Sequence, residues 1–591
     1  MNIINNPISD LESYIDEFQS AELPLLNITI LRNITVEPIK PYIEYLTLCM
    51  GFRANLVFGD YDNILQDILT SKLLQKNSDC TMVFLKLETL SPALIYRFTE
   101  LSPKEIQSEI ELIHNFIDTA LKGIRAKTNS LVCWHGFELP ISPAFGMLDF
   151  GNESMQYAVI EGLNRFLKKQ LSTHSSCYYI DLNNIRSTLG IFNFYDNRYW
   201  HMAKSPFTLA ALKNIAIDNF KLIRASKGKN KKCLILDCDN TLWGGIVGED
   251  GLDGIKLGPD YPGSAFYEFQ QEILSLHHRG IIIAICSKNN EEDVWSVIDQ
   301  HPHMLLKREH ISAYQINWDD KAQNIQKIAL ELNIGLDSFV FIDDSEFEIN
   351  LINNRLPSVE TIQLNKRHSL DYKAALATCG FFDSLSYTKE DKLRNKQYHE
   401  ENDRKNSRES FDGNIESYLK SLDMVAHLEF ANSSSISRIA QLTQKTNQFN
   451  LTTKRYSESD IKAFTDSKEC IVLTVKLEDR FGNLGIVGCA IVDLVDDEAH
   501  FDTFLLSCRA IGRGLEMVLL HSCIEVLKSL KVNSYNANFI PTQKNKQVED
   551  FYSNFGFKLI SNEAGIRNYI AAENSEFAQK PNYFKTIIFN S

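Results

Sequence analysis

Two aspartates directly follow a run of buried-strand character, and this feature limits the possible folds most. Residues 231–240 have the sequence KKCLILDCDN, in which an apolar run ends in Asp237 and Asp239. In open parallel α/β sheets, ligands bind just beyond the carboxyl ends of the strands. Two carboxylates this close repel each other unless a cation lies between them, and oxygen ligands favour a hard ion such as Mg²⁺. The sequence therefore predicts a parallel sheet with a divalent cation at the end of this strand.

Further polar residues follow in the order that a site for a phosphoryl group needs. An apolar strand at 280–286 is followed by a hydroxyl, an ammonium and an amide, which can bind phosphoryl oxygens. A lysine then opens an amphipathic helix, and the strand SFVFI ends in an acidic pair. Each group alone could be a helix cap, a surface charge or a loop, but their joint order favours one site. The residues are Ser287, Lys288, Asn289, Lys321, Asp343 and Asp344.

The order Asp-x-Asp-x-Thr, Ser, Lys and an acidic pair resembles the haloacid dehalogenase (HAD) superfamily. The resemblance implies that Asp237 is the nucleophile that takes the phosphoryl group and that Asp239 is the acid/base. Mg²⁺ would be held by Asp237, the backbone carbonyl of Asp239 and one residue of the acidic pair. Of that pair, Asp344 is preferred over Asp343. The implied phosphoryl-binding residues are Thr241, Ser287, Lys288, Asn289 and Lys321.

The spacing of these groups leaves no room for a large lid. The chain between Thr241 and Ser287 already contains an amphipathic helix at 264–279, and the chain from Ser287 to Lys321 contains another helix. Neither gap can hold the folded cap domain that encloses small substrates in many HAD enzymes. We therefore expect an open site, which suits a macromolecule or a group tethered to one.

The last part of the chain contains a glycine-rich loop between a predicted strand and a predicted helix. Residues 509–514 have the pattern Arg-x-x-Gly-x-Gly, which resembles the acyl-CoA-binding loop of GNAT acyltransferases, where backbone amides at a helix N-terminus cradle a pyrophosphate. A later segment matches the GNAT element Tyr-x-x-x-Gly-Phe. The resemblance implies CoA or phosphopantetheine as a ligand; a glycine cap and a core aromatic cluster are the structural alternative. The implied contacts are Arg509, Gly512, Arg513, Gly514 and Tyr552.

Several motifs together resemble a narrower family, the FkbH-like proteins, which are HAD phosphatases of subfamily IIIC. These motifs are LDCDNTLWGGIVGEDG, CSKNN, FIDDSEFE, QLTQKTNQFNLTTKRYS and LLSCRAIGRGLE, and the Trp-Gly-Gly and KTNQFN elements are the most specific. The resemblance implies an enzyme that dephosphorylates the acyl phosphate 1,3-bisphosphoglycerate and loads a glyceryl unit as a thioester on an acyl carrier protein, in polyketide or related biosynthesis. The implied partners are a phosphorylated three-carbon acid and the phosphopantetheine arm of the carrier.

Formation of a thioester would be helped by a thiol relay, for which Cys238 and Cys508 are candidates by position. Cys238 lies between two carboxylates, where a thiolate is electrostatically disfavoured. We therefore favour Cys508 as a catalytic thiol, with core packing as the alternative. The cysteines as a set lack the spacing of a disulfide framework or a structural zinc site.

The N-terminal part alternates short apolar runs with amphipathic segments, as βαβ units around a parallel sheet do. It resembles the SGNH-like domain that precedes the HAD core in three-domain FkbH-like proteins. Asn33 stands where an SGNH hydrolase has its nucleophilic serine, and no suitably spaced Asp-x-x-His follows. We therefore predict a non-hydrolytic binding or scaffold domain, in which His114 and His135 are structural.

These patterns predict one multidomain α/β chain with a linker. Residues 1–225 form a flavodoxin-like α/β domain of SGNH type, and residues 230–380 form a Rossmann-like parallel sheet of HAD type without a large cap. Residues 421–591 form a GNAT-like mixed α+β domain. Residues 381–420 carry charges of both signs, which favours a solvated helical linker.

The net charge of −15 repels phosphate backbones, so nucleic acid is not an expected partner, and an acidic carrier protein would need a local basic patch. The sequence has no apolar run of membrane-spanning length and no signal peptide, so we expect a cytoplasmic protein without a membrane partner. Two alternatives stay open. One is a plain HAD phosphatase or a GNAT-type N-acyltransferase of a sugar or cell-surface polysaccharide pathway, and the other is a catalytically silent assembly protein.

Overall fold

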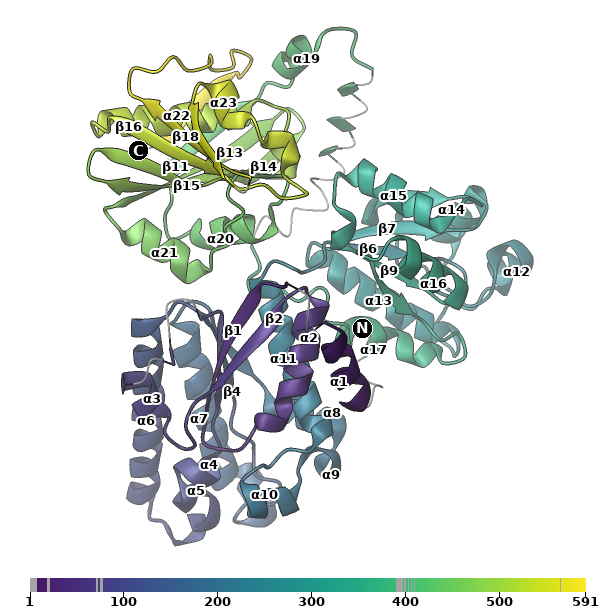
Figure 1. The fold of residues 1–591 in the computed structure, drawn as a ribbon. Coiled ribbons are helices and arrows are strands. Elements are labelled where there is room, and N and C mark those ends of the chain that lie inside the picture. Colours follow the sequence, from purple (N-terminus) through teal and green to yellow (C-terminus); the bar gives the residue numbers. More distant parts are fainter. Residues whose placement is uncertain are drawn as a thin grey trace. The chain divides into compact units, whose positions relative to one another are not determined.

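The chain divides into two compact units, each described by itself below. The structure is a computed structural model that describes residues 8–18, 22–70, 73–74, 78–388, 397, 400–401, 403–404, 407–408, 410–563 and 565–590. The first unit comprises Met1–Lys227 and Ser457–Asp460, and the second comprises Gly228–Tyr456 and Ile461–Ser591. Figure 1 colours the chain from purple at the first residues to yellow at the last.

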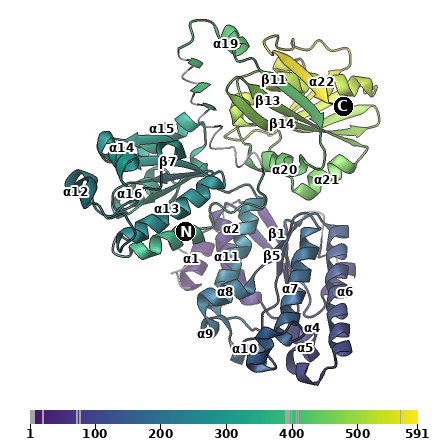
Figure 2. The ribbon, with the colours of Figure 1, turned by 180° about the vertical axis from the view of Figure 1, so that it is seen from behind.

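The first unit contains a five-stranded parallel sheet with helices on both faces. The strands are β1 (Leu25–Arg32), β2 (Arg53–Phe58), β3 (Cys80–Phe84), β4 (Leu131–His135) and β5 (Cys177–Ile180). The helices are α1 (Ile8–Glu17), α2 (Lys40–Cys49), α3 (Ile64–Thr70), α4 (Leu87–Leu90), α5 (Pro92–Tyr96), α6 (Pro103–Lys127), α7 (Gln156–Ser172), α8 (Leu182–Leu189), α9 (Ile191–Phe194), α10 (Asn197–Ala203) and α11 (Leu209–Ser226). The strand order is β2-β1-β3-β4-β5. Helices α2, α8 and α11 pack on one face and α3, α6 and α7 on the other, so β3 and β4 are buried along their whole length (Figure 2).

Asn33 directly follows β1, at the position where an SGNH hydrolase has its nucleophilic serine. Its side-chain amide donates to the Lys86 carbonyl over 3.1 Å, and its Oδ1 accepts from the Lys86 amide over 2.8 Å. The Lys86 ammonium is itself buried and pairs with Glu138 at 3.1 Å and Glu88 at 3.0 Å. Asn33 therefore ties the ends of β1 and β3 together through the backbone of Lys86.

The two histidines singled out in this domain have structural surroundings. The His135 ring is buried, with Nδ1 2.8 Å from the Val83 carbonyl and Nε2 2.8 Å from the Asn219 side-chain amide. Burial lowers the pKa of His135 to about 3, so its ring stays neutral. His114 stacks on Phe166 with ring centroids 3.6 Å apart. Both rings pack within the domain, and the His135 ring also makes hydrogen bonds there.

The second unit begins with another five-stranded parallel sheet. Its strands are β6 (Cys233–Leu236), β7 (Ile282–Ser287), β8 (Ile311–Ile316), β9 (Phe339–Asp343) and β10 (Glu360–Gln363). Its helices are α12 (Val247–Gly254), α13 (Gly263–His278), α14 (Glu291–Gln300), α15 (Lys321–Leu332), α16 (Glu346–Arg355) and α17 (Tyr372–Thr378). The strand order is β10-β9-β6-β7-β8. Helices α13, α14 and α17 pack on one face and α15 and α16 on the other.

The connections of this sheet are short. The chain between β6 and β7 holds α12 and α13, and the chain between β7 and α15 holds α14 and β8. An antiparallel bridge between Gly244 and Lys256 closes the base of the segment that carries α12. That segment is a small flap, and neither connection holds a separate folded domain.

The last part of the second unit is a mixed sheet of nine strands. The strands are β11 (Val425–Phe430), β12 (Phe449–Asn450), β13 (Cys470–Asp479), β14 (Gly482–Val495), β15 (Glu498–Leu506), β16 (Ser534–Phe539), β17 (Lys558–Glu563), β18 (Ile566–Ala572) and β19 (Thr586–Asn590). The helices are α19 (Ile415–Ser421), α20 (Ile436–Lys445), α21 (Glu458–Asp466), α22 (Leu515–Ser529) and α23 (Phe551–Phe555). The order is β17-β18-β16-β15-β14-β13-β11-β19, and β12 adds to β15. Helix α22 packs on one face of the sheet and α20 on the other.

The predicted linker at 381–420 is described in part, because residues 389–396 and several residues up to 409 lie outside the described chain. Its described residues are not solvated throughout. Arg404 is buried and makes two hydrogen bonds with Asp479 at the end of β13, at 2.7 and 2.8 Å. Arg513 adds contacts of 3.1 Å to Asp479 and 2.7 Å to Glu401. This buried network, Glu401–Arg404–Asp479–Arg513, fastens the segment to the C-terminal sheet.

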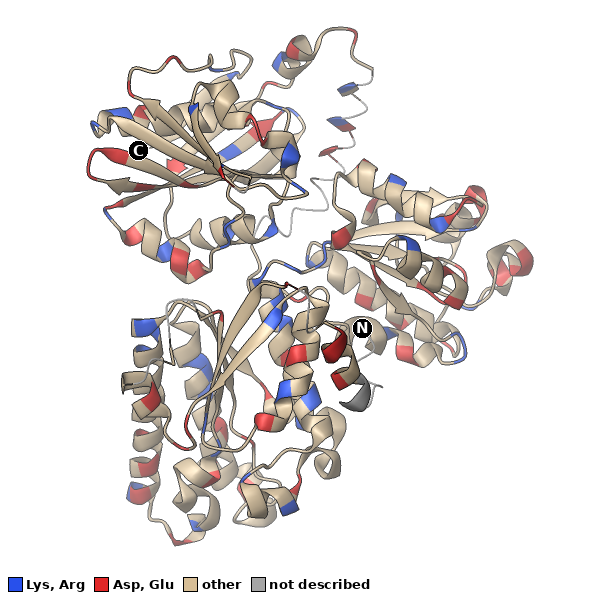
Figure 3. Ribbon diagram, in the orientation of Figure 1, with Lys and Arg blue, Asp and Glu red and all other residues tan. Residues whose placement is uncertain are grey.

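Charges and cysteines are spread over the molecule. Figure 3 shows Lys and Arg interspersed with Asp and Glu along the elements of each domain, with an acidic α12. Eight of the twelve cysteines are buried and none of the twelve is in a disulfide. Within the described chain, no helix has the length and apolar character needed to cross a membrane.

Removing the shared acid of the buried network should destabilise the C-terminal domain. Asp479→Ala removes a fully inaccessible carboxylate that two buried guanidinium groups share. We therefore expect a loss of about 3 kcal/mol of unfolding free energy. Arg308→Ala is the control, because it breaks a half-exposed pair with Asp299 and should cost below about 1 kcal/mol. Urea unfolding followed by far-ultraviolet circular dichroism measures both. Equal urea midpoints for the two variants would contradict the stabilising role of Asp479 in the buried network.

Candidate active site

The polar residues predicted to share a site come together at one edge of the β6–β10 sheet. Strands β9, β6, β7 and β8 are neighbours and run parallel, so their carboxyl ends meet. Asp237 follows β6, and its amide donates to the Ile342 carbonyl, one residue before Asp343. The hydrogen-bond register of the sheet therefore places Asp237 beside the acidic pair Asp343 and Asp344.

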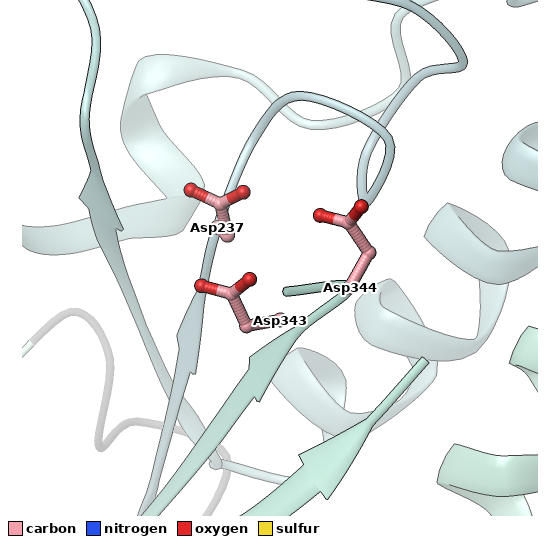
Figure 4. A group of neighbouring side chains, drawn as sticks. All are labelled: Asp237, Asp343 and Asp344. Carbon is pink, nitrogen blue, oxygen red and sulfur yellow. The ribbon is translucent and has the colours of Figure 1, made fainter. Parts of the chain in front are cut away.

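Asp237, Asp343 and Asp344 form an acidic group at this edge. One carboxylate oxygen of each lies within 4.8 Å of those of the other two, and Figure 4 shows the three side chains converging from two strand ends. Burial and then the charge of Asp237 raise the pKa of Asp343 to about 7 and that of Asp344 to about 6. Three carboxylates gathered in one group fit a hard divalent cation such as Mg²⁺, which would relieve their repulsion.

Lys321 lies against two of these carboxylates. It is buried, and its Nζ is 2.7 Å from Asp237 Oδ1 and 2.6 Å from Asp343 Oδ2. Burial works against its charge, but the two carboxylates outweigh this and raise its pKa. Asp320 caps α15 by accepting from the Ala322 and Gln323 amides, which fixes the start of the helix that carries Lys321. The lysine thus holds a permanent positive charge beside the predicted nucleophile.

The carboxylate of Asp239 lies outside the acidic group and is held by three N–H donors. Its Oδ1 accepts from Trp243 Nε1 at 2.9 Å and from the Val247 amide at 3.0 Å, and its Oδ2 accepts from Asn289 Nδ2 at 2.8 Å. Burial raises the pKa of Asp239, although these donors oppose the shift. The side chain is therefore fixed in orientation at the end of β6.

Trp243 and Val247 are site residues that the sequence interpretation missed. Trp243 is fully buried, and its ring nitrogen is committed to Asp239. The Trp-Gly-Gly element was the available signal, since a tryptophan so close to two aspartates can return its donor to one of them. Asn240, with φ of 53°, and Gly245, with φ of 99°, form the turn that brings Trp243 back toward Asp239.

The residues after β7 separate into different contacts. Ser287 is buried at the strand end, and Asn289 binds Asp239. Lys288 instead pairs with Glu348 of α16 at 2.7 Å, so the structure does not direct its ammonium at the acidic group. Thr241 is buried, and its hydroxyl has no hydrogen-bond partner in the described part of the chain.

The two candidate thiols follow strands of two different sheets. Cys238 is buried, and burial followed by the charge of Asp237 raises its pKa far above the usual value, which keeps the thiol protonated. Cys508 is half-buried in a short 3₁₀ turn after β15. Among the described residues, no hydrogen bond joins Cys508 to the acidic group.

Four of the predicted CoA-binding residues of the C-terminal domain lie just before α22, and the fifth, Tyr552, lies in α23. Arg513 is buried in the network with Asp479 and Glu401. Tyr552 is buried as well, and its hydroxyl has no partner among the residues that the structure describes. Arg509, Gly512 and Gly514 lie in the loop between β15 and α22, and the two glycines have φ of 79° and 70°.

The chain is similar to several proteins of known structure. No family model and no curated protein matches the chain. The N-terminal part of the protein BF1531 from Bacteroides fragilis, whose crystal structure contains a phosphatase domain complexed with Mg, is 28% identical; the match covers 65% of this chain and all of that chain, with a TM-score of 0.58. The ribosomal-protein-S18-alanine N-acetyltransferase of Escherichia coli is 16% identical, over 25% of this chain and 97% of that chain, with a TM-score of 0.20. The PaiA N-acetyltransferase of Thermoplasma acidophilum, in complex with coenzyme A, is 12% identical over 25% and 98%, with a TM-score of 0.19.

The acidic group predicts how Mg²⁺ binding depends on pH. A carboxyl group with a raised pKa binds its proton more tightly in the folded protein, so its contribution to stability falls as pH rises from about 4 to about 7. Mg²⁺ must displace these protons at low pH. We therefore expect Mg²⁺ to raise the melting temperature more at about pH 8 than at about pH 5.

Differential scanning fluorimetry with Mg²⁺ or EDTA tests this expectation. Asp344→Asn should remove most of the Mg²⁺-dependent shift, whereas Asp299→Asn, at an exposed ion pair, should keep it. A shift of the same size in both variants would mean that the ion binds elsewhere.

Proposed function

We propose that this chain is a Mg²⁺-dependent phosphoryl-transfer enzyme whose site is the acidic group with Lys321. The observation that carries the proposal is the convergence of Asp237, Asp343 and Asp344 around a buried lysine at the carboxyl edge of a parallel sheet. The Bacteroides fragilis structure supports it, because that protein contains a phosphatase domain with bound Mg.

The residues of the site suit a two-step transfer. In the first step, a carboxylate oxygen of Asp237 forms a bond to phosphorus, and the bond from phosphorus to the leaving oxygen breaks with its electron pair. Lys321 and Ser287 bind the phosphoryl oxygens. Asp237, the acidic pair and the backbone carbonyl of Asp239 would hold Mg²⁺, which would supply neutralising charge. In the second step, water attacks phosphorus, Asp239 takes the proton of that water, and the bond from phosphorus to Asp237 breaks to release inorganic phosphate. The three donors to Asp239 keep its carboxylate in place.

We further propose, from the FkbH-like motifs, that the substrate is an acyl phosphate of a three-carbon acid and that the acyl group is passed to the thiol of an acyl carrier protein. The small flap between β6 and β7 supports this, because no separate cap domain stands between the site and a tethered arm. The two bond changes involve different phosphates of 1,3-bisphosphoglycerate: Asp237 would take the phosphoryl group of the phosphate ester, and the carrier thiolate would attack the acyl carbon and expel the acyl phosphate group as inorganic phosphate.

Loss of the nucleophile should abolish turnover. Asp237→Asn is expected to reduce phosphate release from a small phosphate monoester by about 10³-fold or more, since the amide cannot form the covalent intermediate. Phosphate release with Mg²⁺ present measures this, and Asp299→Asn is the surface control. Residual activity within tenfold of the unchanged enzyme would contradict the assigned role.

The carrier proposal has its own measurement. The enzyme is incubated with Mg²⁺, 1,3-bisphosphoglycerate and a carrier protein bearing phosphopantetheine, and the intact carrier is weighed by mass spectrometry. We expect a glyceryl adduct that Asp237→Asn does not form. Phosphate release without an adduct on several carriers would instead indicate a plain phosphatase.

The tryptophan donor gives a more graded effect. Trp243→Phe keeps a large buried ring but removes the 2.9 Å hydrogen bond to Asp239, so we expect kcat to fall about tenfold. Trp295→Phe is a matched control, because its ring nitrogen binds Glu291 on α14. Equal kcat values for the two variants would show that the Trp243 donor has no part in turnover.

A further inference from the structure

The two parallel strands in the middle of the C-terminal sheet pair over part of their length and then separate. β15 and β16 pair from Glu498 to Phe501 and from Ser534 to Ala537, although β15 continues to Leu506 and β16 to Phe539. The backbone groups of β15 beyond Phe501 therefore lack β16 as a partner on that edge. An open strand edge of this kind can be paired by an extended chain or by a ligand that carries amides.

A pantetheine arm would suit such an edge, because it is extended and carries two amide groups. In this chain the edge is already paired by residues 449–451, here called the strap. Phe449 and Asn450 form β12 and pair antiparallel with Leu506 and Leu505. The Leu451 amide donates to the Phe504 carbonyl over 3.1 Å, and the Leu451 carbonyl accepts from the Ile540 amide over 2.8 Å. The strap thus bonds to β15 on one side and to the residue after β16 on the other.

The strap is part of the domain core. Phe449, Asn450 and Leu451 are all buried, and the Phe449 ring packs edge-on against Phe551 with centroids 5.3 Å apart. The buried Asn545 donates through Nδ2 to the carbonyls of Asn450 and Ile540, at 2.9 Å each. The strap is therefore held by backbone pairing, apolar contact and one shared side chain.

The chain after the strap is anchored to β15 as well. Asp502 accepts from the Tyr456 hydroxyl over 2.6 Å and forms an ion pair with Lys454. Its carbonyl accepts from the Thr452 hydroxyl over 2.8 Å. These contacts keep the strap seated from its C-terminal side.

The loop before α22 is also poorly suited to a pyrophosphate. Arg513, a cation between the two glycines of the loop, is committed to Asp479 and Glu401. The Tyr583 hydroxyl lies so close to Gly514 that a Cβ at that position would collide with it. Glu516 adds a carboxylate in the first turn of the helix, where a bound phosphate would need positive charge.

We propose that the strap is an internal strand that occupies the cleft between β15 and β16, so that the C-terminal domain does not bind CoA or a pantetheine arm there. The residues present do not fit the cofactor that the sequence pattern of the loop implies, and no acyl transfer is routed through it. The inference concerns the C-terminal domain alone and does not rest on the phosphoryl-transfer proposal.

The test uses the full chain and CoA as the probe. A ligand at about 100 times its dissociation constant would raise the melting temperature by roughly 5 °C or more. We expect no shift with millimolar CoA, whereas Mg²⁺ in the same assay reports on the other domain. We also expect the Leu451 and Ile540 amides to exchange on the order of 10³-fold more slowly than unstructured amides, with or without CoA.

Saturable CoA binding, or strap amides that exchange like an unstructured loop, would overturn the proposal. Asn545→Ala provides a second measurement, because it removes the side chain shared by Asn450 and Ile540. Exchange of the Leu451 amide should then accelerate at least tenfold. Asn536→Ala, on the exposed side of β16 with Glu498 as its partner, should leave that exchange unchanged. Equal exchange in the two variants would show that Asn545 does not hold the strap.

Discussion

Repulsion among three carboxylates is the constraint on which the middle domain depends. Asp237, Asp343 and Asp344 stand at the ends of two paired strands, so the sheet itself forces them together. Lys321 brings one positive charge against three negative ones, which leaves two negative charges to be neutralised. A divalent cation would neutralise these two negative charges. Without a cation, the raised pKa values of Asp343 and Asp344 mean that protons take over part of this neutralisation.

The strand ends of this domain could be predicted from the sequence because their physics is local. KKCLILDCDN, GIIIAICS and SFVFIDD each place polar residues directly after a buried strand, and parallel pairing then brings those ends to one edge. The positions of Asp237, Lys321 and the acidic pair follow from that pattern. Lys288 shows its limit: it stands beside Ser287 in the sequence, but its side chain extends to Glu348 on a helix that follows another strand.

Other features depend on contacts between distant segments and leave no local pattern. The amide that binds Asp239 Oδ2 comes from Asn289, which follows a different strand of the sheet. The buried network joins Arg404 of the charged segment to Asp479 at a hairpin, although the composition of that segment predicts a solvated linker. The glycine loop before α22 has a cofactor-like pattern, but its surroundings are set by Tyr583 and by residues 449–451, both remote in sequence.

The hydrogen bond between Val247 and Asp239 has a mechanical consequence. Val247 is the first residue of α12, so the small flap is fastened to the site through the same carboxylate that is assigned proton transfer. The acidic helix and the acid/base are therefore coupled: α12 cannot move outward from this position without breaking the hydrogen bond between Val247 and Asp239. A partner that binds α12 and displaces it would thus change the position of the Asp239 carboxylate directly, without a change in the sheet.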